Sequence, residues 1–141
     1  MHLSEINSFI EINIWKKKWL IYGTYNPNKN NINSHLSMLQ KSATKLSCDY
    51  DNIIILGDFN SKMSEDVMLN FCNLFSLKNL IKEPTCYKNL DNPSCIDLIL
   101  TSKAKSFQNL KAYEAGLSDV HKFIIIVLKT SFRKQPPNII T

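Results

Sequence analysis

The stretch IIILGDFN, residues 53–60, decides the fold of this chain. Ile53–Leu56 is an apolar run of the length and composition of a buried strand, and Gly57 permits a tight turn directly after it. Asp58 and Asn60 stand two residues apart, so their side chains can project to the same side. A carboxylate and a carboxamide at the end of a buried strand are well placed to build a phosphate or metal site.

Length and composition limit the possibilities. The chain has 141 residues and is one domain at most, or part of one, and a hydrophobic content of 44% is enough for a packed core. The formal charge is +5, which fits a polyanionic partner such as nucleic acid but is also common among ordinary soluble proteins. Lysine supplies nearly all of the basic residues, which suits diffuse attraction to phosphates better than the reading of bases.

The cysteines and the hydropathy pattern indicate the compartment. Cys48, Cys72, Cys86 and Cys95 form no Cys-x-x-Cys pair, which favours buried, reduced thiols, with a bond between Cys86 and Cys95 as the alternative. No apolar run approaches the ~18 residues of a membrane span, and the N-terminus lacks the order of a signal peptide. We therefore expect an intracellular protein without a membrane partner.

Alternating strands and helices predict an α/β fold with a mixed sheet. Residues 16–18 are expected to turn between the first two strands, and Asp97 is expected to be buried. The second helix is expected to begin at an N-cap, Ser64, and to bury Val67, Phe71, Leu74 and Phe75. Strands are predicted at 8–14, 19–25, 53–57, 95–101, 110–115 and 122–128, helices at 32–46 and from 64, long loops at 26–31 and 82–94, and a loose tail at 131–141.

Four polar motifs each follow or interrupt an apolar strand. They are Tyr25-Asn26-Pro27-Asn28, Gly57-Asp58-Phe59-Asn60, Ile96-Asp97-Leu98-Ile99 and Ser118-Asp119-Val120-His121. Each motif alone has a structural explanation: a tyrosine can pack, an aspartate can form a turn or an ion pair, and a single histidine is more often structural than catalytic. The order of all four is the stronger signal.

That series resembles the endonuclease/exonuclease/phosphatase family, the DNase I-like enzymes. The similarity is greatest to the endonuclease domain of jockey-like non-long-terminal-repeat retrotransposons, and residues 80–86, 93–101 and 116–119 also look like those elements. The resemblance implies a truncated two-sheet α/β sandwich of the DNase I-like type. Residues 8–130 would be the C-terminal portion of such a domain, and 131–141 its tail.

The resemblance also implies catalytic roles. Tyr25 matches a tyrosine that hydrogen-bonds the scissile phosphate, Asp58 an aspartate that activates water, and Asn60 an asparagine that orients the water or the phosphate. Asp97 matches the aspartate that supports a catalytic histidine, and His121 matches that histidine, which stabilises charge on phosphorus. Phosphodiester hydrolysis needs a positioned water and neutralisation of the growing charge on the phosphate.

The implied cofactor is Mg²⁺ or Mn²⁺, with Asp119 and Asp58 as metal ligands. Two departures from the family pattern lead us to expect weak binding. The upstream half of the family domain, which carries an asparagine and a glutamate ligand, has no counterpart here. The usual Ser-Asp-His has become Ser118-Asp119-Val120-His121, and one inserted residue changes how adjacent side chains face.

The function implied is therefore a truncated Mg²⁺-dependent phosphodiesterase that ancestrally nicks DNA for retrotransposition and is impaired alone. Expected partners are DNA and the missing N-terminal half or a reverse transcriptase module. Two alternatives stay open: a non-catalytic relic that binds nucleic acid weakly, and a phosphatase of small phosphorylated molecules on the same fold.

Overall fold

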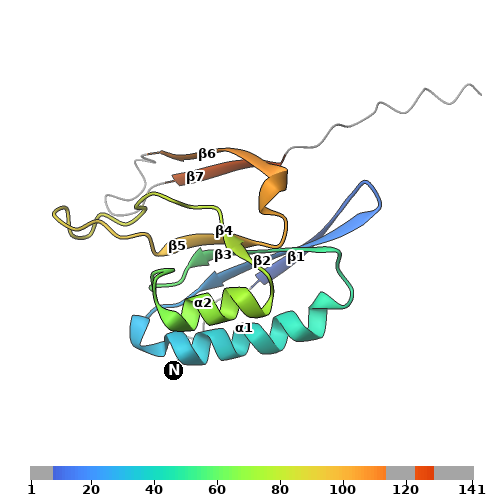
Figure 1. Ribbon diagram of the computed structural model, residues 1–141, viewed down its shortest axis with the longest axis horizontal. Coiled ribbons are helices and arrows are strands. Elements are labelled where there is room, and N and C mark those ends of the chain that lie inside the picture. The colour runs from blue at the N-terminus through green and yellow to red at the C-terminus, as the bar shows by residue number, and fades with distance from the viewer. Residues whose placement is uncertain (1–7, 114–122, 129–141) are drawn as a thin grey trace, which may run out of the picture.

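The stretch that ends in Gly57 and Asp58 forms a central strand of a five-stranded sheet of order β1-β2-β3-β5-β4 (Figure 1). The structure is a computed structural model that describes residues 8–113 and 123–128. A second sheet contains β6 and β7. The elements in chain order are β1 Ser8–Ile14, β2 Lys17–Tyr25, η1 Lys29–Asn31, α1 Ile32–Ser47, β3 Asn52–Asp58, α2 Asp66–Leu74, β4 Lys78–Asn79, β5 Asp97–Thr101, η2 Ala104–Ser106, β6 Phe107–Tyr113 and β7 Phe123–Leu128.

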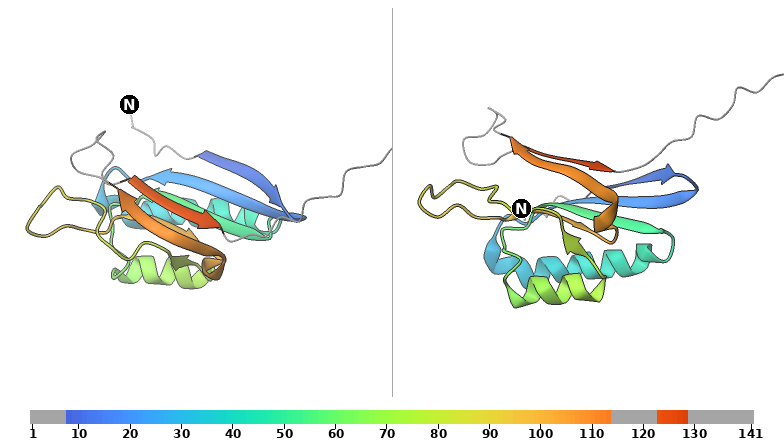
Figure 2. Two further views of the ribbon diagram at one scale, coloured as in Figure 1. Left: turned by 90° about the horizontal axis from the view of Figure 1, so that it is seen from above. Right: turned by 45° about the horizontal axis from the view of Figure 1, so that its top comes forward.

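The two faces of the large sheet carry two separate apolar clusters. Helices α1 and α2 cover one face, and the β6–β7 pair lies over the other, as the two views in Figure 2 show. Alternate residues of β3 take part in each cluster: Ile53 and Ile55 pack under the helices, whereas Ile54 packs on the opposite side. On that opposite side Trp19 meets Phe107 of β6 edge to face, with ring centroids 6.0 Å apart. The predicted two-sheet α/β architecture is confirmed.

Helix α1 makes β2 and β3 parallel neighbours. The sequence predicts an apolar stripe at Ile32, Leu36, Leu39, Ala43 and Leu46 of this helix. The stripe is confirmed at Leu36, Leu39 and Ala43, which are buried, and Leu36 and Leu39 pack in the core cluster with Ile53 and Ile55. A helical crossover of this kind returns the chain to the same end of the sheet, so β2 and β3 run in the same direction. The last residues of both strands therefore reach the same edge.

The first two strands form the expected hairpin, but its turn lies earlier than predicted. Trp15 and Lys16 both have positive φ, 52° and 62°, and they form a two-residue loop before β2 begins at Lys17. The predicted turn at residues 16–18 is wrong because Lys17 and Lys18 already belong to β2 and pair with β1. The alternation of apolar and polar residues in 8–14 predicts a half-buried strand, and this prediction is wrong. The first six residues of β1 are exposed, since β1 is an edge strand.

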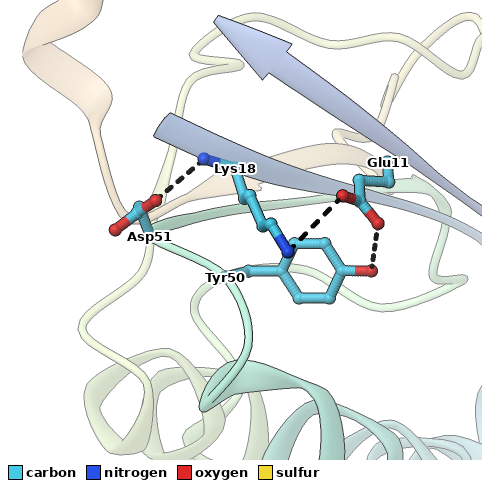
Figure 3. A network of polar contacts seen from close by, with 4 residues as sticks. All are labelled: Glu11, Lys18, Tyr50 and Asp51. Carbon is cyan, nitrogen blue, oxygen red and sulfur yellow. Dashed lines mark hydrogen bonds and ion pairs between the residues drawn. The ribbon is translucent and has the colours of Figure 1, made fainter. Parts of the chain in front are cut away.

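Polar contacts tie this hairpin to the connection between α1 and β3 (Figure 3). The backbone N–H of Lys18 donates to Asp51 Oδ2 at 2.8 Å, and the backbone N–H of Asp51 donates to the Lys18 carbonyl at 2.9 Å. Glu11 Oε2 accepts from the Tyr50 hydroxyl at 3.3 Å, and Glu11 Oε1 lies 4.0 Å from Lys18 Nζ. The reciprocal backbone contacts fix where β3 enters the sheet.

Helix α2 begins later than predicted. Ser64 belongs to a turn that Glu65 closes by donating its N–H to the Lys62 carbonyl at 3.1 Å, and Glu65 is the N-cap, without a side-chain capping bond. Met68, Phe71 and Cys72 form the buried face. The helix ends at Leu74, which is 59% exposed, so its predicted burial is wrong. Among the described residues, no helix combines the length and apolarity needed to cross a membrane.

The remaining strands and thiols follow the predictions in outline. β5 begins at Asp97, which is half-buried rather than buried because it stands at the end of its strand. All four cysteines are free, which excludes the alternative bond, and Cys72 and Cys86 are buried whereas Cys48 is exposed at the end of α1. The predicted strands at 110–115 and 122–128 correspond to β6 and β7. The predicted tail lies outside the described residues.

Gly57 provides a test of this packing. Its φ is +146°, and an added Cβ would lie 1.8 Å from the carbonyl oxygen of Thr24 on β2. We expect Gly57→Ala to lower the free energy of unfolding by about 3 kcal/mol, through backbone strain and a clash that neither strand can relieve. Urea denaturation measures the change.

The matched control is Gly23→Ala on the neighbouring strand. There an added Cβ would meet its nearest atom, Ser8 Oγ, at 3.5 Å, an ordinary contact. We expect a change of less than about 1 kcal/mol, as for a substitution without strain. Equal effects at the two glycines would contradict the close approach of β2 and β3 at Thr24.

Candidate active site

Three of the predicted site residues stand in one row across the sheet. Tyr25 ends β2 and pairs in register with Asp58, which ends β3, and Asp58 pairs with Asp97, which begins β5. Paired residues on neighbouring strands point to the same face, and the strands lie about 4.8 Å apart. By alternation along β3 this is the face opposite the helices, the side of Ile54. The fold therefore gathers residues that are far apart in the sequence at one edge.

The turn after β3 is held in a fixed shape by its own residues. Phe59 is completely buried and meets the ring of His35 edge to face, with centroids 6.1 Å apart. Asn60 has a positive φ of 49°, and its backbone N–H donates to Asp58 Oδ1 at 2.9 Å. This local hydrogen bond is the one that an aspartate makes in turns of this kind. It orients the carboxylate of Asp58 relative to the backbone.

Asn26 connects β2 to that turn, and the sequence interpretation missed its importance. The residue is completely buried, its backbone N–H donates to the Asp58 carbonyl at 2.8 Å, and its Nδ2 donates to the Phe59 carbonyl at 2.9 Å. The carbonyl of Asn26 accepts from Asn60 Nδ2 at 2.7 Å. The available signal was its place between Tyr25 and Pro27, at a strand end.

The start of β5 is hydrogen-bonded to the same turn. The backbone N–H of Phe59 donates to the Ile96 carbonyl at 2.9 Å, next to Asp97. The backbone N–H of Asp97 donates to Oγ1 of the completely buried Thr85 at 3.3 Å. Two aspartates directly opposite each other on paired strands repel, so a cation or a hydrogen-bond donor at this edge stabilises them.

A cleft of about 840 Å³ opens at this edge, and Tyr25, Asp58 and Asn60 line it. We call it the Asp58 cleft. Asp97 stands in the adjacent register position but is not among the lining residues. The charged lining of the cleft combines two carboxylates with three ammonium groups: Asp58, Glu65, Lys29, Lys62 and Lys88. Cationic side chains therefore surround an aspartate in an open cleft, an arrangement that attracts phosphate esters.

Two predicted site residues, Asp119 and His121, lie outside the described residues, and their placement stays a prediction. Within residues 8–113 and 123–128, no group of three or more His, Cys, Asp or Glu side chains is placed to hold a metal ion. Asp58 and Glu65 contribute carboxylates to the same cleft. The ligand set predicted from the resemblance, Asp58 with Asp119, extends beyond the part of the chain that the structure covers.

Solved structures share this fold. The endonuclease domain of TRAS1, a telomere-specific non-LTR retrotransposon, superposes with a TM-score of 0.71 at 14% identity, over 89% of this chain and 64% of that domain. An endonuclease/exonuclease/phosphatase family protein from Leptotrichia buccalis gives a TM-score of 0.58 at 18% identity, covering 88% of this chain and 53% of that protein.

A mannosyl-6-phosphatase from Bacteroides thetaiotaomicron gives a TM-score of 0.59 at 15% identity, covering 88% of this chain and 57% of that enzyme. The chain thus spans less than two thirds of the length of each of these three proteins. At these identities the similarity establishes the fold. No curated protein matches the sequence significantly.

A family model described as endonuclease-reverse transcriptase matches residues 19–125, which is more than half of the chain. The match runs from β2 to β7 and includes all four of the polar motifs. Together with the shared fold, it establishes that the chain belongs to the endonuclease-reverse transcriptase branch of the endonuclease/exonuclease/phosphatase family.

Proposed function

We propose that this chain is a metal-dependent phosphodiesterase domain whose substrate is DNA, as expected for the endonuclease of a mobile element. The observation that supports this most directly is the row formed by Tyr25, Asp58 and Asp97 across three adjacent strands, of which Tyr25 and Asp58 line a cleft with three lysines. The endonuclease domain of TRAS1 has the same fold. The assignment to jockey-like elements rests on the sequence motifs.

Asp58 is the proposed general base that activates water. It stands on a strand end that pairs on both sides, and its Oδ1 is held by the Asn60 backbone N–H. A carboxylate fixed in this way keeps its orientation toward the cleft without reorganisation during the reaction, which is what general-base catalysis requires. Removal of such a group costs about 10²–10⁴ in rate.

Tyr25 and Asn60 are proposed to position the phosphate. Tyr25 is 44% exposed and lines the Asp58 cleft, so the residue is accessible to a ligand there. Asn60 uses one N–H of its carboxamide for the Asn26 carbonyl, which fixes the plane of the amide and leaves its carbonyl oxygen and second N–H as potential ligand contacts. Asp97 and His121 keep the roles that the resemblance implies, support of the histidine and stabilisation of charge on phosphorus.

The oxygen ligands of the Asp58 cleft fit Mg²⁺ or Mn²⁺. Mg²⁺ binds through one or two carboxylates together with waters and substrate phosphate, and Asp58 and Glu65 both line this cleft. Asp58 would hold the ion together with Asp119. A bound divalent cation would neutralise charge on the phosphate and relieve the repulsion between the facing aspartates.

The proposed domain would be impaired alone and would need an upstream half or a reverse transcriptase module, as the sequence departures lead us to propose. Two alternatives are separable from it by experiment. A non-catalytic relic would bind DNA without cleaving it. A phosphatase of small molecules would hydrolyse phosphate monoesters, and the fold similarity to a mannosyl-6-phosphatase is consistent with this alternative.

Replacement of Asp58 tests the proposed chemistry. We expect the chain to nick supercoiled plasmid slowly in Mg²⁺ or Mn²⁺, and Asp58→Ala to lower the rate by at least about 100-fold, because the general base is lost. The control is Asp49→Ala, an exposed carboxylate beyond α1. Nicking that survives Asp58→Ala would contradict the assignment of the base.

Metal binding is measured separately from activity. Calorimetric titration with Mn²⁺ should show weak binding that Asp58→Ala abolishes and Asp49→Ala leaves unchanged, since Asp58 would contribute a ligand oxygen. Chelation with EDTA should stop nicking. Tight binding that is insensitive to Asp58→Ala would place the ion elsewhere in the chain.

Asn26→Ala tests the coupling between β2 and the turn. The substitution removes the hydrogen bond from Nδ2 to the Phe59 carbonyl in a completely buried position. We expect unfolding free energy to fall by about 1–3 kcal/mol and the nicking rate to fall by about 100-fold, because Asp58 shifts within the turn.

Asn70→Ala, an exposed asparagine of α2, is the matched control and should change neither quantity. The decisive comparison is made at a temperature where the Asn26→Ala variant is fully folded by circular dichroism. A folded Asn26→Ala variant with unchanged nicking would show that the turn holds Asp58 without help from β2.

A further inference from the structure

A second hollow of about 600 Å³ lies beside the Asp58 cleft, between α2, β4 and the segment that leads into β5. Its ionisable lining contains three lysines, Lys62, Lys78 and Lys82, together with two thiols, and its lining residues include no aspartate or glutamate. We call it the lysine trough. The Asp58 cleft, by comparison, mixes both signs of charge.

The two hollows are adjacent. Lys62 and Ser94 line both of them. Both positions are fixed by backbone hydrogen bonds: the Lys62 carbonyl accepts from the Glu65 N–H at 3.1 Å, and Ser94 exchanges hydrogen bonds of 2.9 Å with Cys86 in both directions. The lysine trough therefore lies directly beside any ligand that fills the Asp58 cleft.

The thiols do not offset the positive charge of the trough. Burial raises the pKa of Cys72 to about 11, so this thiol is uncharged at neutral pH. Burial is also the main cause that raises the pKa of Cys95; Asp97 raises it further, and Lys82 acts in the opposite direction. The pKa of Cys95 is thus affected both by Asp97 of the site row and by Lys82 of the trough.

We propose that the lysine trough holds the phosphodiester backbone of a nucleic-acid strand whose scissile phosphate lies in the Asp58 cleft. The proposal rests on the proposed function and adds a binding site for the DNA outside the cleft that holds the scissile phosphate. A small phosphate monoester has one anionic group, which the lysines of the Asp58 cleft can meet by themselves. Three exposed lysines in a separate, adjacent hollow match a chain of successive phosphates.

The test is binding, measured without cleavage. Fluorescence anisotropy of a labelled DNA duplex in EDTA, over a range of salt concentrations, gives the slope of log K against log salt. That slope is negative, and each lost phosphate contact reduces its magnitude by about 0.9. The Lys78→Gln/Lys82→Gln variant should therefore show a slope whose magnitude is about 1.8 smaller than that of the unmodified chain, and weaker binding at low salt. Both lysines are exposed, so the variant should fold normally.

The matched control removes the same charge elsewhere. Lys41→Gln/Lys45→Gln alters two exposed lysines of α1, on the helix layer away from the trough. Its slope should equal that of the unmodified chain. Equal slopes for the two double variants would overturn the proposal, as would displacement of the duplex by poly-glutamate at equal charge concentration.

The DNA-binding test of the trough and the nicking test of Asp58 can fail independently of each other. If nicking depends on Asp58 while the trough variant binds DNA like the α1 control, the trough proposal fails and the chemistry stands. If the slope falls as expected while nicking survives Asp58→Ala, the trough binds DNA and the catalytic assignment fails.

Discussion

The parallel pairing of β2 with β3 is the constraint on which the rest of the structure depends. It runs over seven residue pairs, from Trp19 with Asn52 to Tyr25 with Asp58, and it needs the close approach of the Thr24 carbonyl to Gly57. Helix α1 makes the pairing possible because it returns the chain across the sheet. Once β2 and β3 end at the same level, Tyr25 and Asp58 are neighbours without any further adjustment.

Local strain at the site is offset by burial and hydrogen bonding. Gly57 and Asn60 both have positive φ, a conformation that costs about 1 kcal/mol or more for a residue with a side chain. Phe59, between them, is completely buried, and Asn26 makes three hydrogen bonds to residues 58–60. The core thus holds a turn that an isolated peptide would not keep, and the functional side chains stand on that turn.

The sequence predicted the parts of the fold that follow from local patterns. The strand before Gly57, the stripe of Leu36, Leu39 and Ala43 and the hairpin of the first two strands all have clear periodicity or turn residues. It failed where tertiary context decides. The exposure of β1 depends on its place at the sheet edge, and the start of α2 at Asp66 depends on a preceding turn that closes between Lys62 and Glu65.

The same distinction applies to the candidate site. The motifs identified Tyr25, Asp58 and Asp97 one by one, but their register across three strands comes from long-range pairing that no local pattern contains. Asn26 looked like one more polar loop residue because its role consists of contacts to a segment more than thirty positions away. The lysine trough is not visible in the sequence for a similar reason: Lys62 and Ser94, more than thirty positions apart, line one hollow only in the folded chain. Lys62, Lys78 and Lys82 are separated in the sequence, and they line one hollow beside the Asp58 cleft only after the chain has folded.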